Sequence, residues 1–250
     1  MRWDPQVYGR YADERGRPFV DLLDRVGAEK PRRVVDLGCG PGTLTALLAQ
    51  RWPDAQVEGL DSSAEMIAAA QPAERLTFRV QDVSSWTVPD DADVVISNAT
   101  LQWVPTQREL LASWAGALPP DGWLAFQVPG NFGAPSHALM RSLAATWGVA
   151  DVLRHEDAVA TPAEYADLLL GAGLRVDVWE TTYLHVLAGD DPVLQWVRGT
   201  GLRPVLAALS PSDADEFSAA YARLLREAYP PGEHGTLFPF RRIFAVGHRS

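Results

Sequence analysis

The stretch RRVVDLGCGPGTLTALLAQRW, residues 32–52, contains three glycines at alternate positions, Gly38, Gly40 and Gly42. An apolar run precedes them and a helical pattern follows, which predicts a strand, a tight turn and a helix. Glycine is unfavourable inside a regular element, so three in one turn indicate that another group approaches this backbone closely. In open α/β sheets, such a unit binds ligands at the carboxyl ends of the strands. The segment therefore predicts both a fold class and a ligand site.

The alternation of strands and helices continues to about residue 128. We expect strands at 33–37, 56–60, 77–80, 93–97 and 123–128, with helices at 43–52, 64–70 and 106–118 between them. This spacing is typical of βαβ units. An alternating pattern at 174–187 and the segment 240–249 predict two more strands, separated by a largely helical region at 190–229. Before them, Thr161 as an N-cap and Pro162 at the first helical position predict the start of a helix. The prediction is an α/β fold with a doubly wound, mostly parallel, seven-stranded sheet.

The 250 residues are consistent with one domain that carries insertions. Within a single domain 1–250, we expect an N-terminal helix and lid at 1–30, with an amphipathic helix at 17–28. A ligand-binding core follows at 31–128, and two helical insertions at 129–172 and 188–237 form a cap.

Composition restricts the location and the partners of the protein. The formal net charge of −10 argues against a nucleic-acid partner. The single cysteine, Cys39, rules out an internal disulfide and is typical of a reducing compartment. No apolar run approaches the ~18 residues of a membrane span. We expect a cytoplasmic protein without membrane or nucleic-acid partners, and a monomer.

The spacing of the glycines distinguishes between kinds of ligand. A dinucleotide-binding turn reads G-x-G-x-x-G, but this chain has Thr43 at the third glycine position. Pro41 also lacks the backbone N–H that a phosphate would use. A phosphate-binding P-loop would need Gly-Lys-Ser/Thr, which is absent. A nicotinamide-dependent dehydrogenase is therefore the weakest alternative, and a tight turn without any ligand remains open.

Acidic residues follow three neighbouring strands. Asp61 ends the second strand, where a carboxylate accepts hydrogen bonds from ribose hydroxyls. Asp82 follows the third strand and suits an exocyclic amine, while the Val83 N–H suits a ring nitrogen. Asp36 ends the first strand, where it would meet a cationic amine. The three carboxylates suit an adenosine with a positively charged tail and would repel a pyrophosphate.

Four segments in order resemble the motif series of class I S-adenosylmethionine-dependent methyltransferases: VVDLGCGPGTLT (34–45), GLDSS (59–63), QDVSSW (81–86) and ISNATLQWV (96–104). The resemblance implies a Rossmann-like sheet with a reversed final strand and S-adenosylmethionine as cofactor, with S-adenosylhomocysteine as product. It also implies cofactor contacts that fall on the glycine turn and on the ends of strands two to four. These residues are Asp36, Gly38, Gly40, Gly42, Asp61, Ser62, Met66, Asp82, Val83 and Asn98.

Almost the full chain is similar to one family of this class, the trans-aconitate 2-methyltransferases. Segments outside the generic motifs carry the similarity: WDPQVY (3–8), RPFVDLLDRV (17–26), QVPGNF (127–132), VDVWETTYLH (176–185), TGLRP (200–204) and FPFRRIF (238–244). The resemblance implies methyl-ester formation on one carboxylate of a small unsaturated tricarboxylic acid. A carboxylate with a pKa near ~4 is already ionised at pH 7, so no general base is expected.

Such an acid needs arginines and hydrogen-bond donors to orient it. We expect Tyr183 and His185 on the sixth strand, and Arg203, to contact it. Arg241 and Arg242 point to opposite faces of a strand, and we favour Arg242 for the pocket. Tyr8 and Arg15 would act from the N-terminal lid. Residues 146–163 show the weakest resemblance to the family, and this segment could reshape the pocket for another acid.

Two further functions remain open. A natural-product tailoring methyltransferase would act on a hydroxyl, amine or carbon, with His137 or His185 as a base for a hydroxyl. A non-catalytic cofactor-binding module would bind the cofactor without turnover. No cluster of His, Cys or Asp has metal-ligand spacing, so we expect no metal.

Overall fold

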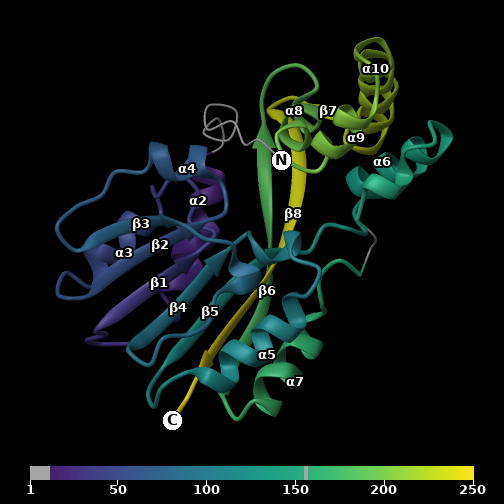
Figure 1. The fold of residues 1–250 in the computed structure, drawn as a ribbon. Helices are drawn as coiled ribbons and strands as arrows, with labels where there is room; N and C mark the ends of the chain where they lie inside the picture. Colours follow the sequence, from purple (N-terminus) through teal and green to yellow (C-terminus); the bar gives the residue numbers. More distant parts are fainter. Residues whose placement is uncertain (1–11, 155–156) are drawn as a thin grey trace. The chain divides into compact units, whose positions relative to one another are not determined.

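The computed structural model describes residues 12–154 and 157–250, with side chains from residue 16 onward. Figure 1 shows the chain path. The strands are β1 (Arg33–Leu37), β2 (Gln56–Asp61), β3 (Leu76–Val80), β4 (Ala92–Asn98), β5 (Trp123–Pro129), β6 (Arg175–Leu187), β7 (Pro231–Gly232) and β8 (Gly235–His248). The α-helices are α2 (Ala12–Leu23), α3 (Thr45–Arg51), α4 (Ala64–Ala69), α5 (Gln107–Ala117), α6 (Pro135–Thr146), α7 (Pro162–Gly171), α8 (Pro192–Arg198), α9 (Arg203–Ala208) and α10 (Pro211–Ala228). Short 3-10 helices are η1 (Val83–Ser85), η2 (Leu101–Trp103) and η3 (Ala150–Val152).

The sheet has the predicted doubly wound topology. Its strand order is β3-β2-β1-β4-β5-β8-β6, and the two-residue β7 pairs with β8. The four pairs among β1 to β5 are parallel. The direction of winding reverses between β1 and β4, and ligands of such sheets bind beside this point. The fold prediction is therefore confirmed.

The last strand runs against its neighbour β5. The Arg249 N–H donates to the Gly122 carbonyl before β5, and the Gly130 N–H after β5 donates to the Arg241 carbonyl. Residue numbers that fall on one strand while they rise on the other are the sign of an antiparallel pair. The reversed final strand implied by the family resemblance is present.

Consecutive residues of the central strands are buried. Val34 and Val35 of β1, and Val94 and Val95 of β4, have no exposed surface. Neighbouring side chains on a strand point to opposite faces, so both faces of this part of the sheet are covered. This explains why the sequences of β1 and β4 are apolar almost throughout and do not alternate strictly between apolar and polar residues.

The contacts divide the chain into two compact units. The first comprises residues 1–128, 160–180 and 243–250, and the second comprises 129–159 and 181–242. We expected one domain with insertions at 129–172 and 188–237, so the boundaries differ. Helix α7, expected in an insertion, belongs to the first unit because Tyr165 donates a 2.7 Å hydrogen bond to Gln107 of α5 and packs edge-on against Phe126.

Local signals set several element boundaries. Thr161 and Glu164 form the capping box that begins α7, with Pro162 at its first position as predicted. The region 190–229, predicted to be largely helical, contains three helices, since residues 199–202 interrupt it after α8 and Ser210 caps a new helix through the Asp213 N–H. Helix α2 lies at Ala12–Leu23, earlier than the expected 17–28.

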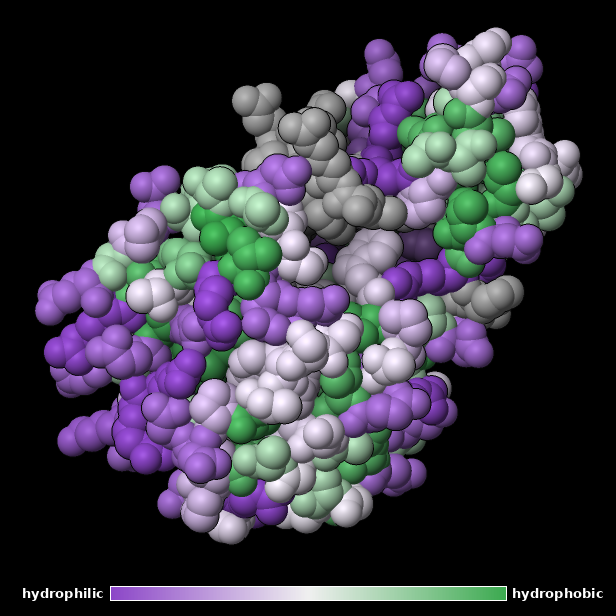
Figure 2. All heavy atoms as spheres, viewed as in Figure 1, coloured by the Kyte–Doolittle hydropathy of each residue, from purple (hydrophilic) through white to green (hydrophobic). Residues whose placement is uncertain are grey.

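Polar side chains cover much of the surface. In Figure 2, hydrophilic residues spread over the visible face of each unit and hydrophobic ones are exposed in small groups. Among the described residues, none of the helices combines the length and apolar character needed to cross a membrane.

Candidate functional site

The three glycines of the turn after β1 serve different purposes. All have positive φ, at 79° for Gly38, 56° for Gly40 and 78° for Gly42. A β-carbon on Gly38 would lie 2.0 Å from Oγ1 of Thr100, and one on Gly42 would lie 2.5 Å from the Phe78 ring. A β-carbon on Gly40 would meet nothing within 4 Å among the described atoms. Protein packing thus explains two of the glycines, and Gly40 alone faces open space.

The N–H groups of this turn already have protein partners. Gly38 and Cys39 both donate to the Leu60 carbonyl, and Gly42 donates to the Cys39 carbonyl. Gly40 donates to Oδ2 of Asp61 at 2.9 Å. Pro41 has no N–H to donate. A pyrophosphate would need several of these donors, so the turn is unsuited to a dinucleotide.

Asp61 links the glycine turn to the turn after β2. One of its carboxylate oxygens accepts from the Gly40 N–H, and the other accepts from the Ser63 N–H at 2.8 Å. A carboxylate has about four acceptor positions, so two more donors fit it. The adjacent Ser62 is exposed, whereas Ser63 is buried and caps α4 by accepting from the Met66 N–H. The side chain of Asp61 is therefore held in place for a further pair of donors.

Asp36 is a buried carboxyl group beside this turn. It is 2% exposed, and Oγ1 of Thr45 donates to it at 2.7 Å. Burial raises the pKa of Asp36 to about 7; the Thr45 hydrogen bond opposes this rise and the charge of Asp61 adds to it. A neighbouring cation would favour its ionised form. Burial also raises the pKa of the Cys39 thiol, which makes this cysteine a poor nucleophile.

The other predicted cofactor residues lie on α4 and at η1 of the first unit. Asp82 is exposed and caps η1, its Oδ1 accepting from the Ser84 N–H at 2.8 Å. Val83 and Met66 are buried. The Gln81 N–H donates to the Asp61 carbonyl, which ties the ends of β2 and β3 together. Asp61, the last residue of β2, and Asp82, just after β3, thus lie at the ends of neighbouring strands, as the sequence pattern predicted.

The end of β4 and the turn after it hold the predicted Asn98 and a buried glutamine, Gln102, that the sequence analysis did not single out. Ala99 has a positive φ of 54°, a strained conformation for alanine. Gln102 is 4% exposed, and its Nε2 donates to the Ala99 carbonyl at 2.5 Å. The buried Oδ1 of Asn98 and Oε1 of Gln102 have no hydrogen-bond partner within the described part of the chain. The sequence signal for Gln102 was its position between the apolar residues Leu101 and Trp103, because a buried amide needs hydrogen-bond partners.

In the second unit, predicted acceptor residues join an aromatic cluster. The rings of Tyr183 and His185 lie 6.4 Å apart, and His185 lies 4.7 Å from Trp196. Arg242 is 5% exposed, and its guanidinium lies 4.6 Å from the ring centre of Phe240. The structure thus brings Tyr183, His185 and Arg242 onto the buried side of β6 and β8.

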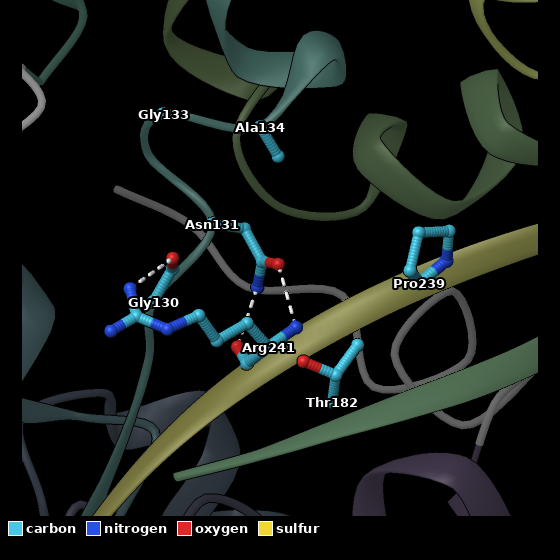
Figure 3. A pocket seen from close by; sticks show the side chains of 7 residues that line it. All are labelled: Gly130, Asn131, Gly133, Ala134, Thr182, Pro239 and Arg241. Atoms are coloured by element: carbon cyan, nitrogen blue, oxygen red, sulfur yellow. Dashed lines mark hydrogen bonds between the residues drawn. The ribbon is translucent and has the colours of Figure 1, made fainter.

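A pocket of ≈ 330 Å³ lies elsewhere in the second unit. Its walls come from the turn at 130–134, from Thr182 of β6, and from Pro239 and Arg241 of β8 (Figure 3). The arginine in this wall is Arg241, whereas Arg242, which we favoured for the acceptor pocket, lies on the other face of β8. Strand alternation explains the difference, since consecutive side chains of β8 point to opposite faces.

Four residues named in the sequence analysis remain: Arg203, Tyr8, Arg15 and His137. Arg203 is the first residue of α9. Tyr8 lies outside the described residues, and Arg15 falls in α2 among the residues whose side chains are not described. Burial lowers the pKa of His137 to about 4, and the charge of Arg141 contributes. Within residues 12–154 and 157–250, no three His, Cys, Asp or Glu side chains are grouped to hold a metal ion.

Comparison with known proteins agrees with this geometry. A family model described as a methyltransferase domain matches residues 8–177. A trans-aconitate 2-methyltransferase from Streptomyces avermitilis is 55% identical, covering 99% of this chain and 97% of its own. One from Rhodococcus jostii is 56% identical, covering 98% of each. The chain belongs to the trans-aconitate 2-methyltransferase family.

Solved structures that are less identical in sequence than these relatives share the fold of this chain. Geranyl diphosphate C-methyltransferase from Streptomyces coelicolor, solved with Mg²⁺, geranyl diphosphate and S-adenosyl-L-homocysteine, has a TM-score of 0.56 and 15% identity. The match covers 98% of this chain and 83% of that one. A nicotinamide-dependent dehydrogenase is excluded, because the chain belongs to the trans-aconitate 2-methyltransferase family and the N–H groups of its glycine turn already have protein partners.

Proposed function

We propose that the protein transfers a methyl group from S-adenosylmethionine to one carboxylate of trans-aconitate and forms a methyl ester. The observation that carries this proposal is the glycine turn, whose N–H groups are used internally and whose neighbours are carboxylates. Such a site disfavours phosphates and favours an adenosine with a cationic tail. The family relationship supports trans-aconitate as the acceptor.

The residues of the first unit fit S-adenosylmethionine. The open space at Gly40 would admit its methionine portion, and Asp36 would attract its ammonium group. The buried carbonyl oxygens of Asn98 and Gln102 would accept hydrogen bonds from the same group. Asp61, with Ser62, would hold the ribose. Asp82, Val83 and Met66 would hold the adenine.

The chemistry requires positioning more than proton transfer. The cofactor, when bound, supplies a methyl group activated by its sulfonium. The acceptor carboxylate is ionised at neutral pH, so the chain needs no general base. Its residues must hold one carboxylate oxygen about 3 Å from the methyl carbon, in line with the leaving sulfur. This mechanism requires no role for the thiol of Cys39, whose pKa is raised by burial.

The acceptor contacts are proposals. Tyr183, His185, Arg203 and Arg242 would donate to its carboxylates, with Tyr8 and Arg15 acting from the N-terminal segment. The adjacency of Tyr183 and His185 and the burial of Arg242 support a shared role for these three. A tailoring role for His137 as base is unsupported, because desolvation lowers its pKa to about 4, far below neutral pH.

Solution properties follow from composition. We propose that the protein acts as a monomer in the cytoplasm and does not bind nucleic acid. The net charge of −10 supports the monomeric state and the absence of a nucleic-acid partner. Light scattering coupled to size-exclusion chromatography measures the oligomeric state.

The decisive experiment is methyl transfer from labelled S-adenosylmethionine to a panel of di- and tricarboxylic acids. We expect transfer to trans-aconitate as a base-labile ester. Binding of the cofactor by calorimetry without transfer to any acid would refute the carboxyl assignment. Transfer to an alcohol or amine that resists base would instead indicate the tailoring enzyme.

A further inference from the structure

The pocket in the second unit contains an arginine whose position is unusually well determined. Asn131 is 3% exposed, and its side chain makes two hydrogen bonds to the backbone of Arg241. Nδ2 donates to the Arg241 carbonyl at 2.8 Å, and Oδ1 accepts from the Arg241 N–H at 2.8 Å. The Gly130 N–H donates to the same carbonyl at 2.9 Å. One buried asparagine is thus devoted to holding the backbone of one residue.

The guanidinium is oriented by the same turn. Nη1 of Arg241 donates to the Gly130 carbonyl at 3.3 Å, and Figure 3 shows the side chain extending along the pocket wall beside Gly130. Four hydrogen bonds therefore connect Arg241 to two consecutive residues. Functional groups held in this way by surrounding hydrogen bonds are preorganised, which lowers the entropy lost when a ligand binds.

We propose that Arg241 binds a carboxylate of the acceptor in this pocket, with Asn131 as its positioning residue. This inference rests on the proposed function, but it replaces Tyr183, His185 and Arg242 by Arg241 as the acceptor contact, since one small acid does not reach both faces of β8. The side chain belongs to the partly exposed face of β8, whereas Arg242 is buried against Phe240 on the other face. Of the two consecutive arginines, Arg241 is therefore the one that a small acid in this pocket reaches.

The rest of the pocket suits an anion. Helix α6 begins next to it at Pro135, with no acidic residue in the first turn. Its first N–H groups have protein partners, Ser136 donating to the Tyr229 hydroxyl, so only the helix dipole favours negative charge here. Gly133 and Ala134 are small, which leaves the space between this helix end and Arg241 open. A guanidinium fork binds both oxygens of a carboxylate and fixes its plane, which lysine does not do.

The test compares Arg241→Gln, Arg241→Lys and Asn131→Ala with Arg242→Gln and with Arg223→Gln, an exposed control on α10. Acceptors are trans-aconitate and the three dicarboxylates that each lack one of its carboxylates, mesaconate, (Z)-glutaconate and itaconate. For Arg241→Gln, we expect the KM for trans-aconitate to rise about 10- to 100-fold, since a charged hydrogen bond is lost. The affinity for S-adenosylmethionine, measured by calorimetry, should not change.

The dicarboxylates identify the bound carboxylate. One of them should react equally well with the parent and with Arg241→Gln, because it lacks the group that Arg241 binds. Arg241→Lys should recover only part of the affinity. Asn131→Ala should raise the KM less than Arg241→Gln does, and Arg223→Gln should leave it unchanged. Equal KM values for Arg241→Gln and Arg223→Gln would overturn the proposal, as would an effect confined to Arg242→Gln.

A direct binding measurement separates this inference from the proposed function. Calorimetry with trans-aconitate in the presence of S-adenosylhomocysteine needs no turnover. If the parent methylates no acid, the proposed function fails. The pocket is then supported by trans-aconitate binding that Arg241→Gln abolishes, and refuted by trans-aconitate binding that is absent or insensitive to this change.

Discussion

The hydroxyl oxygen of Thr100 lies 2.0 Å from the position that a β-carbon on Gly38 would take. A turn after one strand therefore fills the space beside a turn after another. Oγ1 of Thr100 also lies 3.3 Å from the Gly38 carbonyl oxygen, to which it donates a hydrogen bond. Gly38 is required by the protein itself, whereas no described atom lies within 4 Å of a β-carbon placed on Gly40.

This contrast predicts two different defects. Gly38→Ala should lose roughly 2–5 kcal/mol of stability, since it combines a positive φ with a clash. Gly40→Ala should lose only about 1–2 kcal/mol, for its positive φ, but should weaken S-adenosylmethionine binding at least tenfold. Urea denaturation and calorimetry measure the two quantities. Equal loss of stability in both variants would contradict the assignment.

Asp36 predicts a pH dependence of cofactor binding. Its pKa in the free protein is raised to about 7, and a bound ammonium group favours the ionised carboxylate. The dissociation constant for S-adenosylmethionine should therefore rise by up to about tenfold per pH unit below pH 7. Asp36→Asn should bind more weakly at pH 8 and show little change with pH. A parent affinity that is constant from pH 5 to 8 would refute this role.

Gln102 should contribute to recognition of the amino-acid end of the cofactor. Its buried Oε1 lacks a hydrogen-bond partner among the described residues. Gln102→Met keeps the length of the side chain and should weaken S-adenosylhomocysteine binding about 10-fold, for one lost hydrogen bond to a charged group. Binding of 5′-methylthioadenosine, which has no amino-acid part, provides the control. Equal weakening of both ligands would indicate only a distorted turn.

His137 predicts how acid destabilises the second unit. Burial depresses its pKa in the folded state to about 4, below its ordinary value of 6.5. The unfolded chain then binds more protons between these values, so this residue lowers the free energy of unfolding as pH falls from 6.5 to 4. His137→Gln should lose less stability than the parent over this range, as measured by urea denaturation at pH 5 and pH 8.

Asp36 changes stability with pH in the opposite direction to His137, so the experiment needs a control that separates the two groups. Its raised pKa means that the folded state holds the extra proton, so its contribution decreases as pH rises from 3.8 to about 7. The two effects partly cancel in the parent protein. Only the difference between each variant and the parent isolates one group, and a His137→Gln difference that does not vary with pH would refute the burial argument.

Much of the fold was predictable because its signals are local. Strand β1 has the predicted bounds, and β2 to β5 begin and end within one residue of the predictions. The cap of α7 was read from Thr161 and Pro162 alone. The helical character of 190–229 was also predicted, but its division into three helices, with an interruption that contains Gly199 and Gly201, was not.

The sequence by itself determined the sheet, the family and the carboxylates that follow β1 to β3. Those features depend on periodicity and on spacings of a few residues, which a single chain displays directly. Only the tertiary structure decided which glycine faces open space and which arginine enters the pocket. Both depend on partners far away in the chain, Thr100 for Gly38 and Asn131 for Arg241, and no local pattern records such contacts.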